Sequence, residues 1–419
     1  MAFLRMLRQR HLAILWLSQI LSAIGDNLYT IAVVWIAVQV AGSGAGLVVA
    51  AQSVSALAFG LLGGVYADRW NRRTTMIVVD LVRAAAVAVL PVVAWTGTLQ
   101  LWHMAAVAVV IGAMGSLFDP ALQASLPSLA GNERTLQATN GLMDITRRLA
   151  RAIGPSLAGV LVAVLPVSQF FTLDALSYII SAIALLSLGR RFAWKPERAV
   201  SHRSGMAGVV GEVIGAVRLV ADHRPLVWAL ISLGVSCIAW SIAFTVGVPL
   251  LTKDQLAGSI GAYGLIVGAY GAANVVGNLI VGSLAIRRRV LVLFTGRVVL
   301  GSGFLILAAA DSLPLAMFGS AIAALGGPMG DLIMLTMIQT DFASGQIGKI
   351  FSLRMTVASA GISLGLLLAV PLYSWAPTSL VMIGCGLTIL ATGVAGLLRF
   401  VRGPATPRQS QVEIAPSSD

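Results

Sequence analysis

Residues 63–73, Gly-Gly-Val-Tyr-Ala-Asp-Arg-Trp-Asn-Arg-Arg, decide the fold because they place four charges in a very short link between two long apolar segments. The charged residues are Asp68, Arg69, Arg72 and Arg73. The flanking segments, near residues 45–66 and 74–96, are each long enough to cross a bilayer as a helix of about 20 residues. The link is therefore expected to be a tight cytoplasmic turn, whose charges satisfy one another or the ends of nearby helices.

The composition of the whole chain indicates a membrane protein. Hydrophobic residues make up 58% of the 419 residues and charged residues only 11%. The mean hydropathy is +0.91. Soluble domains carry about 25% charged residues, so this chain could not solvate the surface of a large soluble fold.

Windows of about 20 residues predict an all-α membrane protein with roughly twelve transmembrane helices. The predicted spans lie near residues 12–38, 45–66, 74–96, 102–125, 140–164, 168–189, 225–251, 260–285, 290–310, 314–338, 350–373 and 377–398. The first span is too long for the core of a signal peptide, so we expect it to remain in the mature protein.

The placement of the basic residues predicts the orientation in the membrane. The net charge is +12, and basic residues gather at the N-terminus, in the 63–73 link, in the central linker and in alternate links after it. Only Lys253 lies on the opposite side. This is the positive-inside pattern, which places both termini in the cytoplasm and leaves no basic patch that requires a nucleic-acid partner.

A single long polar interval divides the predicted spans into two halves. The predicted parts are an N-terminal six-helix bundle (1–189), a cytoplasmic linker (190–224), a C-terminal six-helix bundle (225–399) and a disordered cytoplasmic tail (400–419). Residues repeat between the halves at an offset of about 212–214: Arg83 with Arg297, Gly115 with Gly327, and Asp119 with Asp331. Such repeats are typical of transporters that bind substrate between two halves.

The 63–73 link resembles the signature of the major facilitator superfamily, Gly-x-x-x-Asp-Arg-x-Gly-Arg-Arg. The matching residues are Gly64, Asp68, Arg69, Arg72 and Arg73, and Asn71 replaces the usual glycine. The resemblance implies two pseudo-symmetric six-helix bundles and a gating role for the turn. The second half repeats the motif poorly, because Ile286 stands in place of the acid before Arg287, Arg288 and Arg289.

The predicted fifth span resembles the pattern associated with the antiporters of this superfamily, Gly-x8-Gly-x3-Gly-Pro-x2-Gly-Gly. The matching residues are Gly141, Ala150, Gly154, Pro155, Ala158 and Gly159, with alanine at two glycine positions. Positions 150, 154 and 158 form one ridge that lets a neighbouring helix approach closely. Ordinary packing of small residues is the alternative interpretation.

Four further stretches resemble the branch that contains macrolide efflux proteins and the enterobactin exporter. They are Leu21–Asn27, Asp119–Pro127, Phe171–Ser177 and Glu212–Arg218. The resemblance implies proton-driven export of amphipathic small molecules such as drugs or macrolides from the cytoplasm of a bacterium. A siderophore exporter and a lysophospholipid transporter remain alternatives, as does a membrane sensor or assembly protein that does not transport. No phosphate-binding loop occurs, so we expect no direct use of ATP. The sequence shows no catalytic constellation, and we expect no enzyme activity, no cofactor and a monomer.

Proton coupling requires an acid that changes its protonation inside the membrane, where desolvation disfavours the charged form. The candidate residues are Asp26, Asp119, Asp174 and Asp331. Asp26 leads because no basic residue lies within a turn on its own helix, and such a residue is a functional hypothesis by default. Asp80 is instead expected to form an ion pair with Arg83, one helical turn away.

Bulky side chains in the predicted spans are candidates for the substrate cavity. They are Tyr29, Phe118, Gln123, Trp240, Phe244, Met334 and Met337. Aromatic residues and methionines suit bulky amphipathic ligands, although they also serve ordinary packing. Arg147, Arg148 and Arg151 attract an anionic substrate, reach towards lipid headgroups or pair with Asp144. Cys237 and Cys385 lie in different halves, and their spacing predicts neither a disulfide nor a metal site.

Overall fold

The computed structural model describes residues 9–67, 71–97, 99–130, 164–188, 214–256, 258–284, 286 and 288–401, together with single positions between 139 and 162. All the named elements in this part of the chain are helices. Asp68, Arg69, Gly141, Pro155 and Gly159, five of the residues in the two predicted signatures, lie outside the described residues.

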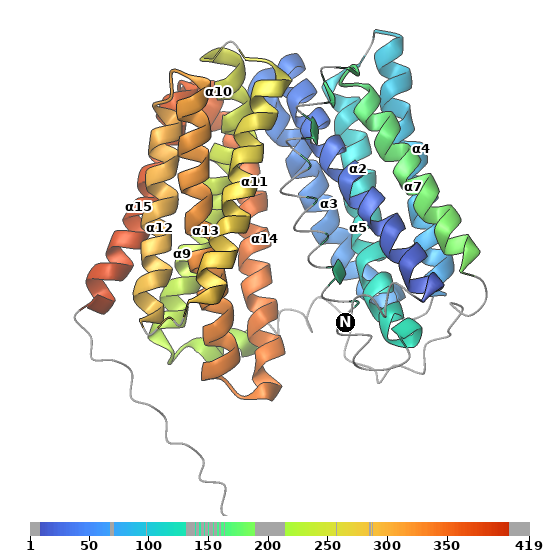
Figure 1. Ribbon diagram of the computed structural model, residues 1–419. Coiled ribbons are helices and arrows are strands. Elements are labelled where there is room, and N and C mark those ends of the chain that lie inside the picture. Colours follow the sequence, from blue (N-terminus) through green and yellow to red (C-terminus); the bar gives the residue numbers. More distant parts are fainter. Residues whose placement is uncertain are drawn as a thin grey trace, which may run out of the picture.

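The helices form two groups that follow one another in the sequence (Figure 1). The first group contains α2 (Arg10–Ala41), the short 3-10 helix η1 (Gly42–Gly44), α3 (Ala45–Ala67), α4 (Arg72–Trp95), α5 (Leu101–Ala130) and α7 (Gln169–Ser187). The second contains α9 (Arg224–Trp240), η3 (Ser241–Gly247), α10 (Val248–Asp254), α11 (Ile260–Ser283), α12 (Arg289–Ala308), α13 (Leu313–Asp341), α14 (Ser344–Trp375) and α15 (Thr378–Val401).

The lengths and composition of these helices confirm a multi-pass membrane protein. Ten stretches of the described chain are long and apolar enough to cross a membrane, and one of them, Arg10–Ala56, combines α2 with the beginning of α3. Many large apolar side chains point outward, for example Leu17 (55% exposed) and Val92 (60% exposed). In water such a surface would be unfavourable, whereas lipid acyl chains cover it without cost.

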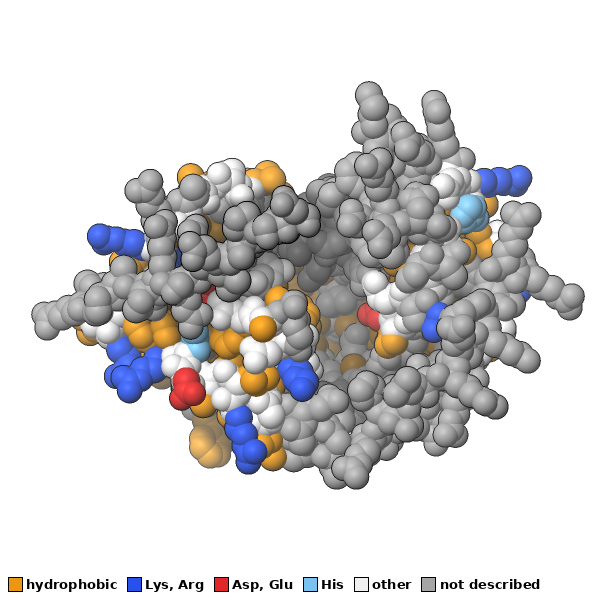
Figure 2. Space-filling model, turned by 90° about the horizontal axis from the view of Figure 1, so that it is seen from below, with side chains coloured by type: hydrophobic (Ala, Val, Ile, Leu, Met, Phe, Trp, Pro, Cys, Tyr) orange, Lys and Arg blue, Asp and Glu red, His pale blue; other side chains and the backbone are white. Residues whose placement is uncertain are grey.

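The two bundles meet at one end and separate towards the other. In Figure 1 they approach each other near α10 and diverge towards the end where α2 begins and α15 ends. Figure 2, seen from that diverging end, shows a hollow between the two halves. The bundles therefore enclose a space that opens on the side where the described chain begins and ends.

Three contacts hold the bundles together at the closed end. The Trp35 ring of α2 stacks on the Tyr263 ring of α11, with centroids 5.8 Å apart. The Lys253 ammonium donates a hydrogen bond to the carbonyl oxygen of Val38, at 3.1 Å. Gly46 lets α3 approach α14 so closely that an added Cβ would lie 3.0 Å from the Leu366 carbonyl oxygen.

Within each bundle, glycines allow direct contact between helix backbones. A Cβ added at Gly112 of α5 would lie 2.1 Å from the carbonyl oxygen of Gln52 on α3. A Cβ added at Gly303 of α12 would lie 2.2 Å from the backbone nitrogen of Ala323 on α13. Because neither neighbour is a flexible side chain, any larger residue must push the two helices apart.

We predict that Gly112→Ala lowers the stability of the protein by about 1–3 kcal/mol, the usual cost of overpacking a closely packed interior. The measurement is the apparent unfolding temperature in detergent. Gly384→Ala is the matched control, because nothing lies within 4 Å of a Cβ added at Gly384. Equal unfolding temperatures in the two variants would contradict the contact between α3 and α5.

Candidate transport site

Asp26 lies in the middle of α2, at the contact between α2 and α7. The Tyr178 hydroxyl of α7 donates a hydrogen bond of 2.5 Å to Asp26 Oδ1. The two helices come this close because of Gly25, where an added Cβ would lie 2.6 Å from both Asp174 Oδ1 and Ser177 Oγ. The sequence places Asp26 away from any partner on its own helix, and the tertiary fold supplies one from α7.

Two further acids are buried beside Asp26. Asp80 of α4 and Asp174 of α7 are both 0% exposed. Within the described part of the chain, Asp174 Oδ2 and both oxygens of Asp80 have no hydrogen-bond partner. We call Asp26, Asp80 and Asp174, together with Arg83 and Tyr178, the acidic cluster.

Arg83 is the basic residue of the acidic cluster. Its guanidinium interacts electrostatically with Asp26 and Asp80 and also with Asp174. It lies over the rings of Phe118 (5.3 Å) and Tyr178 (5.4 Å), and it occupies the space beside Gly115. The ion pair expected between Asp80 and Arg83 is therefore not a direct contact, because the guanidinium turns towards the aromatic rings. In the cluster, three carboxyl groups share a single cation, which also interacts electrostatically with Asp119 of α5.

The described part of the antiporter-like pattern packs against the neighbour of Asp26. A Cβ added at Gly154 would lie 2.7 Å from Cβ of Asn27. The Asn27 amide is held in place by a hydrogen bond of 2.6 Å to the Ala23 carbonyl oxygen of its own helix. The glycine therefore sets how closely its helix approaches α2 at the level of the acidic cluster.

The second bundle has a different balance of charge. Arg297 of α12 is 3% exposed, and its Nε and one terminal nitrogen have no hydrogen-bond partner among the described residues. A Cβ added at Gly330 would lie 3.1 Å from the Arg297 guanidinium carbon, so the glycine beside Arg297 is Gly330 rather than Gly327. Asp331 does not contact Arg297 directly but forms an ion pair of 3.1 Å with Arg354 of α14.

An aromatic cluster surrounds the π-helical segment η3, which interrupts the helix formed by α9 and α10. The Trp240 ring stacks on Phe244 at 5.2 Å, and Trp240 Nε1 donates a hydrogen bond of 2.9 Å to the Tyr270 hydroxyl of α11. Short π-helical segments inside α-helices are frequent at functional sites. The sequence predicted Trp240 and Phe244 but missed Tyr270, because nothing in α11 marks the face that turns towards η3.

The other residues predicted for the cavity lie elsewhere. Tyr29, Phe118, Met334 and Met337 are buried in the packing between helices, each no more than 5% exposed. Gln123 of α5 is exposed, as are Asp119 and Asp331. The structure therefore brings Trp240 and Phe244 together but does not gather all seven predicted residues in one place.

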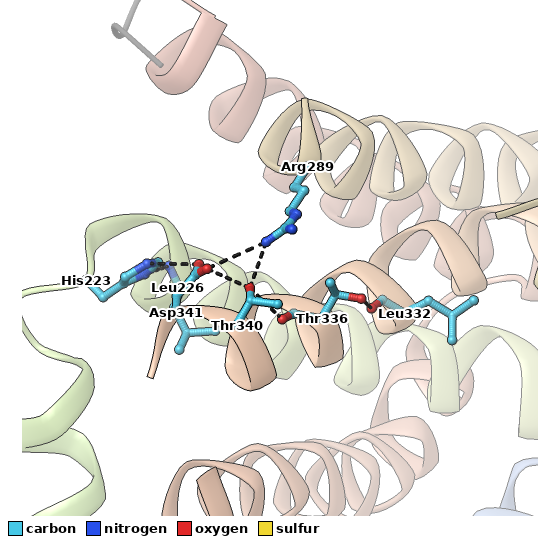
Figure 3. A network of polar contacts seen from close by, with 7 residues as sticks. All are labelled: His223, Leu226, Arg289, Leu332, Thr336, Thr340 and Asp341. Carbon is cyan, nitrogen blue, oxygen red and sulfur yellow. Dashed lines mark hydrogen bonds and ion pairs between the residues drawn. The ribbon is translucent and has the colours of Figure 1, made fainter. Parts of the chain in front are cut away.

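A polar network joins the ends of three helices in the second bundle (Figure 3). Asp341, the last residue of α13, accepts contacts from Arg289 of α12 (3.6 Å) and from Nε2 of His223 (3.4 Å). His223 Nδ1 accepts a hydrogen bond of 3.2 Å from the Leu226 backbone, so a neutral His223 carries its proton on Nε2, facing Asp341. In the repeated turn, Ile286 stands where the first turn has an acid. Asp341 at the end of α13 instead provides a carboxylate for Arg289.

In the first bundle the corresponding turn also contacts a helix end. Asn71 caps α4 by accepting a hydrogen bond of 3.2 Å from the Thr74 backbone. Arg73 donates hydrogen bonds to the carbonyl oxygens of Leu185 (2.9 Å) and Leu186 (2.6 Å) in the last turn of α7. A cation at the C-terminal end of a helix is favourable because it meets the negative end of the helix dipole.

The two apolar helical bundles and the hollow between them define the class of this protein, which is a multi-pass membrane transporter and not an enzyme. The chain belongs to the transmembrane secretion effector family, whose model matches residues 2–406. It is an efflux transporter of the major facilitator type.

Two bacterial efflux proteins have sequences similar to this chain over most of its length. The chain is 27% identical over 412 residues to the multidrug efflux pump Tap of Mycobacterium tuberculosis, and the match covers 96% of this chain and 94% of Tap. It is 24% identical over 315 residues to the macrolide efflux protein A of Enterococcus faecalis, which covers 74% of this chain and 94% of that protein.

Solved structures with the same fold are also transporters. The nucleoside transporter NupG, as a D323A mutant, superimposes with a TM-score of 0.74 at 11% identity, covering 94% of this chain and 99% of NupG. A bacterial homologue of the human lysosomal transporter Spinster superimposes with a TM-score of 0.63 at 12% identity, covering 93% of this chain and 95% of that chain. At these identities the likeness concerns the fold alone.

Proposed function

We propose that this protein is a proton-coupled antiporter that exports amphipathic small molecules such as drugs or macrolides across the bacterial cytoplasmic membrane. The observation that carries the proposal is the acidic cluster, in which three carboxyl groups share the cation Arg83 in the interior of the first bundle. Burying an unpaired carboxylate is costly, so such a cluster favours taking up a proton. The multidrug and macrolide efflux relatives support the substrate class.

Asp26 is the leading coupling residue because its helix also forms the closed end. Trp35 and Val38, which contact the second bundle, lie on α2 beyond Asp26. The distance from Asp26 to Trp35 along the helix axis is about 14 Å at the usual rise per residue. When Asp26 binds a proton, its attraction to Arg83 on α4 is lost, and a small shift of α2 reaches the closed end directly.

The orientation of the open end follows from the charge distribution. The basic residues mark the side of the termini as cytoplasmic by the positive-inside rule. The hollow in Figure 2 opens on the side where α2 begins and α15 ends, which supports the proposal that this state receives substrate from the cytoplasm. In the other state of the cycle, we propose that the turn motif and the network around Asp341 close the cytoplasmic side.

The substrate class is tested by accumulation assays in a bacterial strain that lacks its own efflux pumps. We expect expression of the protein to lower the accumulation of amphipathic drugs or macrolides, and a protonophore to abolish the effect. A catecholate siderophore and a lysophospholipid are assayed in parallel. Export of one of these two, without export of drugs, would reject the proposed substrate class, and export that resists the protonophore would reject proton coupling.

Trp35→Ala is predicted to weaken the closed end. An aromatic pair contributes about 0.5–1.5 kcal/mol beyond the area it buries, which corresponds to roughly a two- to tenfold change in the ratio of closed to open molecules. Spin labels at Ser43 and Gln255, on opposite bundles at this end, should report a larger population of long distances. Trp102→Ala is the control. The partners of the Trp102 side chain among the described residues, Gln100 and His103, belong to its own bundle. Identical distance distributions in both variants would contradict the role of Trp35.

A further inference from the structure

A groove on the outer surface of the second bundle lies between α9 and α15, outside the acidic cluster and the aromatic cluster. Its volume is about 410 Å³. The groove is lined by Trp228, Ile231, Ser232, Thr388, Ala391, Thr392 and Ala395. Leu387 (51% exposed) and Leu398 (72% exposed) lie on the same outward side of α15. The groove therefore opens towards the hydrocarbon of the bilayer.

The hydroxyl groups in this groove are not available to a polar ligand. Thr388 donates to the carbonyl oxygen of Gly384 (2.8 Å) and Thr392 to that of Ile389 (2.7 Å), both within α15. Ser232 Oγ lies 3.5 Å from Thr392 Oγ1. With their donors used inside the protein, these residues present mainly carbon atoms, which suits an acyl chain.

A cation is held at the end of the groove nearest to the chain termini. The Arg399 guanidinium carbon lies 5.0 Å from the centre of the Trp228 ring. Its neighbour Phe400 stacks on Phe294 of α12 at 5.8 Å, which anchors the last turn of α15. Arg224, the first residue of α9, lies one helical turn from Trp228.

Neither arginine is neutralised by an acid in the described part of the chain. No ion pair joins Arg399 or Arg224 to a carboxylate there, and Asp341 is engaged by His223 and Arg289. An apolar groove that ends at two unneutralised arginines and a tryptophan has the chemistry of a lipid site at the membrane surface.

We propose that this groove binds an anionic phospholipid of the bilayer. One acyl chain lies along the groove, and the phosphate lies between Arg399 and Arg224, beside the Trp228 ring. A helix from a second copy of the chain would cover the small residues equally well, but it would leave both guanidinium groups without an anion. The charge therefore favours a lipid over a protein as the occupant.

The test uses the fluorescence of Trp228 in the full-length protein reconstituted into phosphatidylcholine vesicles. A minor fraction of the lipid carries brominated acyl chains, on either phosphatidylglycerol or phosphatidylcholine. The contribution of Trp228 is the difference between the wild type and Trp228→Phe. We expect brominated phosphatidylglycerol to quench this contribution with roughly 30-fold higher apparent affinity than brominated phosphatidylcholine, the factor for two basic residues at about 1 kcal/mol each.

Two variants locate the effect. Arg399→Gln should lower the preference for phosphatidylglycerol about fivefold, because Arg224 remains, whereas Lys349→Gln, which removes one charge from an exposed position on α14, should keep it unchanged. Equal quenching by both lipids in the wild type would overturn the proposal, as would an unchanged preference in Arg399→Gln. Absence of quenching together with a cross-linked dimer through α15 would assign the groove to a second copy instead.

Discussion

Asp26→Asn is expected to abolish substrate accumulation driven by a pH gradient while leaving passive exchange of substrate measurable. Asparagine mimics the protonated acid at nearly constant volume and can still accept the hydrogen bond from Tyr178. It cannot release a proton, so the cycle loses its driving force. One proton contributes about 2.3 kcal/mol per 100 mV, which sustains roughly a 50-fold accumulation, and the variant should approach no accumulation.

The measurement compares driven uptake with exchange in proteoliposomes for the wild type and for Asn substitutions at Asp26, Asp119, Asp174 and Asp331. Asp331→Asn is the most informative comparison, because Asp331 is already paired with Arg354 at 3.1 Å. That variant should reduce the rate of transport but retain the response to the gradient. If Asp26→Asn still concentrates substrate with its proton flux intact, the assignment is wrong and the proton path runs through another of these acids.

Gly154→Leu is expected to cause the second large effect, a loss of at least about tenfold in transport rate with a destabilisation of roughly 1–3 kcal/mol. Any side chain at this position meets Cβ of Asn27, and the Asn27 amide is bound to its own helix. The helix that carries Gly154 must then move away from α2, which displaces Asp26 from Tyr178. Transport assays and unfolding temperatures in detergent measure the two effects.

Two further variants separate local crowding from a general effect of leucine. Gly384→Leu introduces the same side chain where nothing lies within 4 Å, so it should leave transport unchanged. The size swap Gly154→Ala with Asn27→Gly removes the colliding Cβ and should recover part of the transport lost in Gly154→Ala alone. Failure of the swap to recover any activity would show that the glycine acts otherwise than by making room for Asn27.

Several features of the candidate site could be predicted from the sequence because they depend on residues close together in the chain. The isolation of Asp26 on its own helix and the small residues around Gly154 are of this kind. Asp80 and Arg83, whose spacing suggested an ion pair, interact electrostatically but not through a direct contact, because the guanidinium lies over the rings of Phe118 and Tyr178 on other helices. Helical spacing shows which residues can meet and does not show which neighbour competes for them.

The sequence by itself determined the class of the protein, since hydrophobic runs, short charged links and family signatures are properties of consecutive residues. Only the tertiary structure decided which charges meet. Asp331 with Arg354, Asp341 with Arg289 and His223, and Asp26 with Tyr178 each join helices far apart in the chain. The rotation of each helix about its axis selects these partners, and it is set by close contacts such as those at Gly25 and Gly154. Because those contacts arise from the packing of all the helices together, no single stretch of sequence contains them.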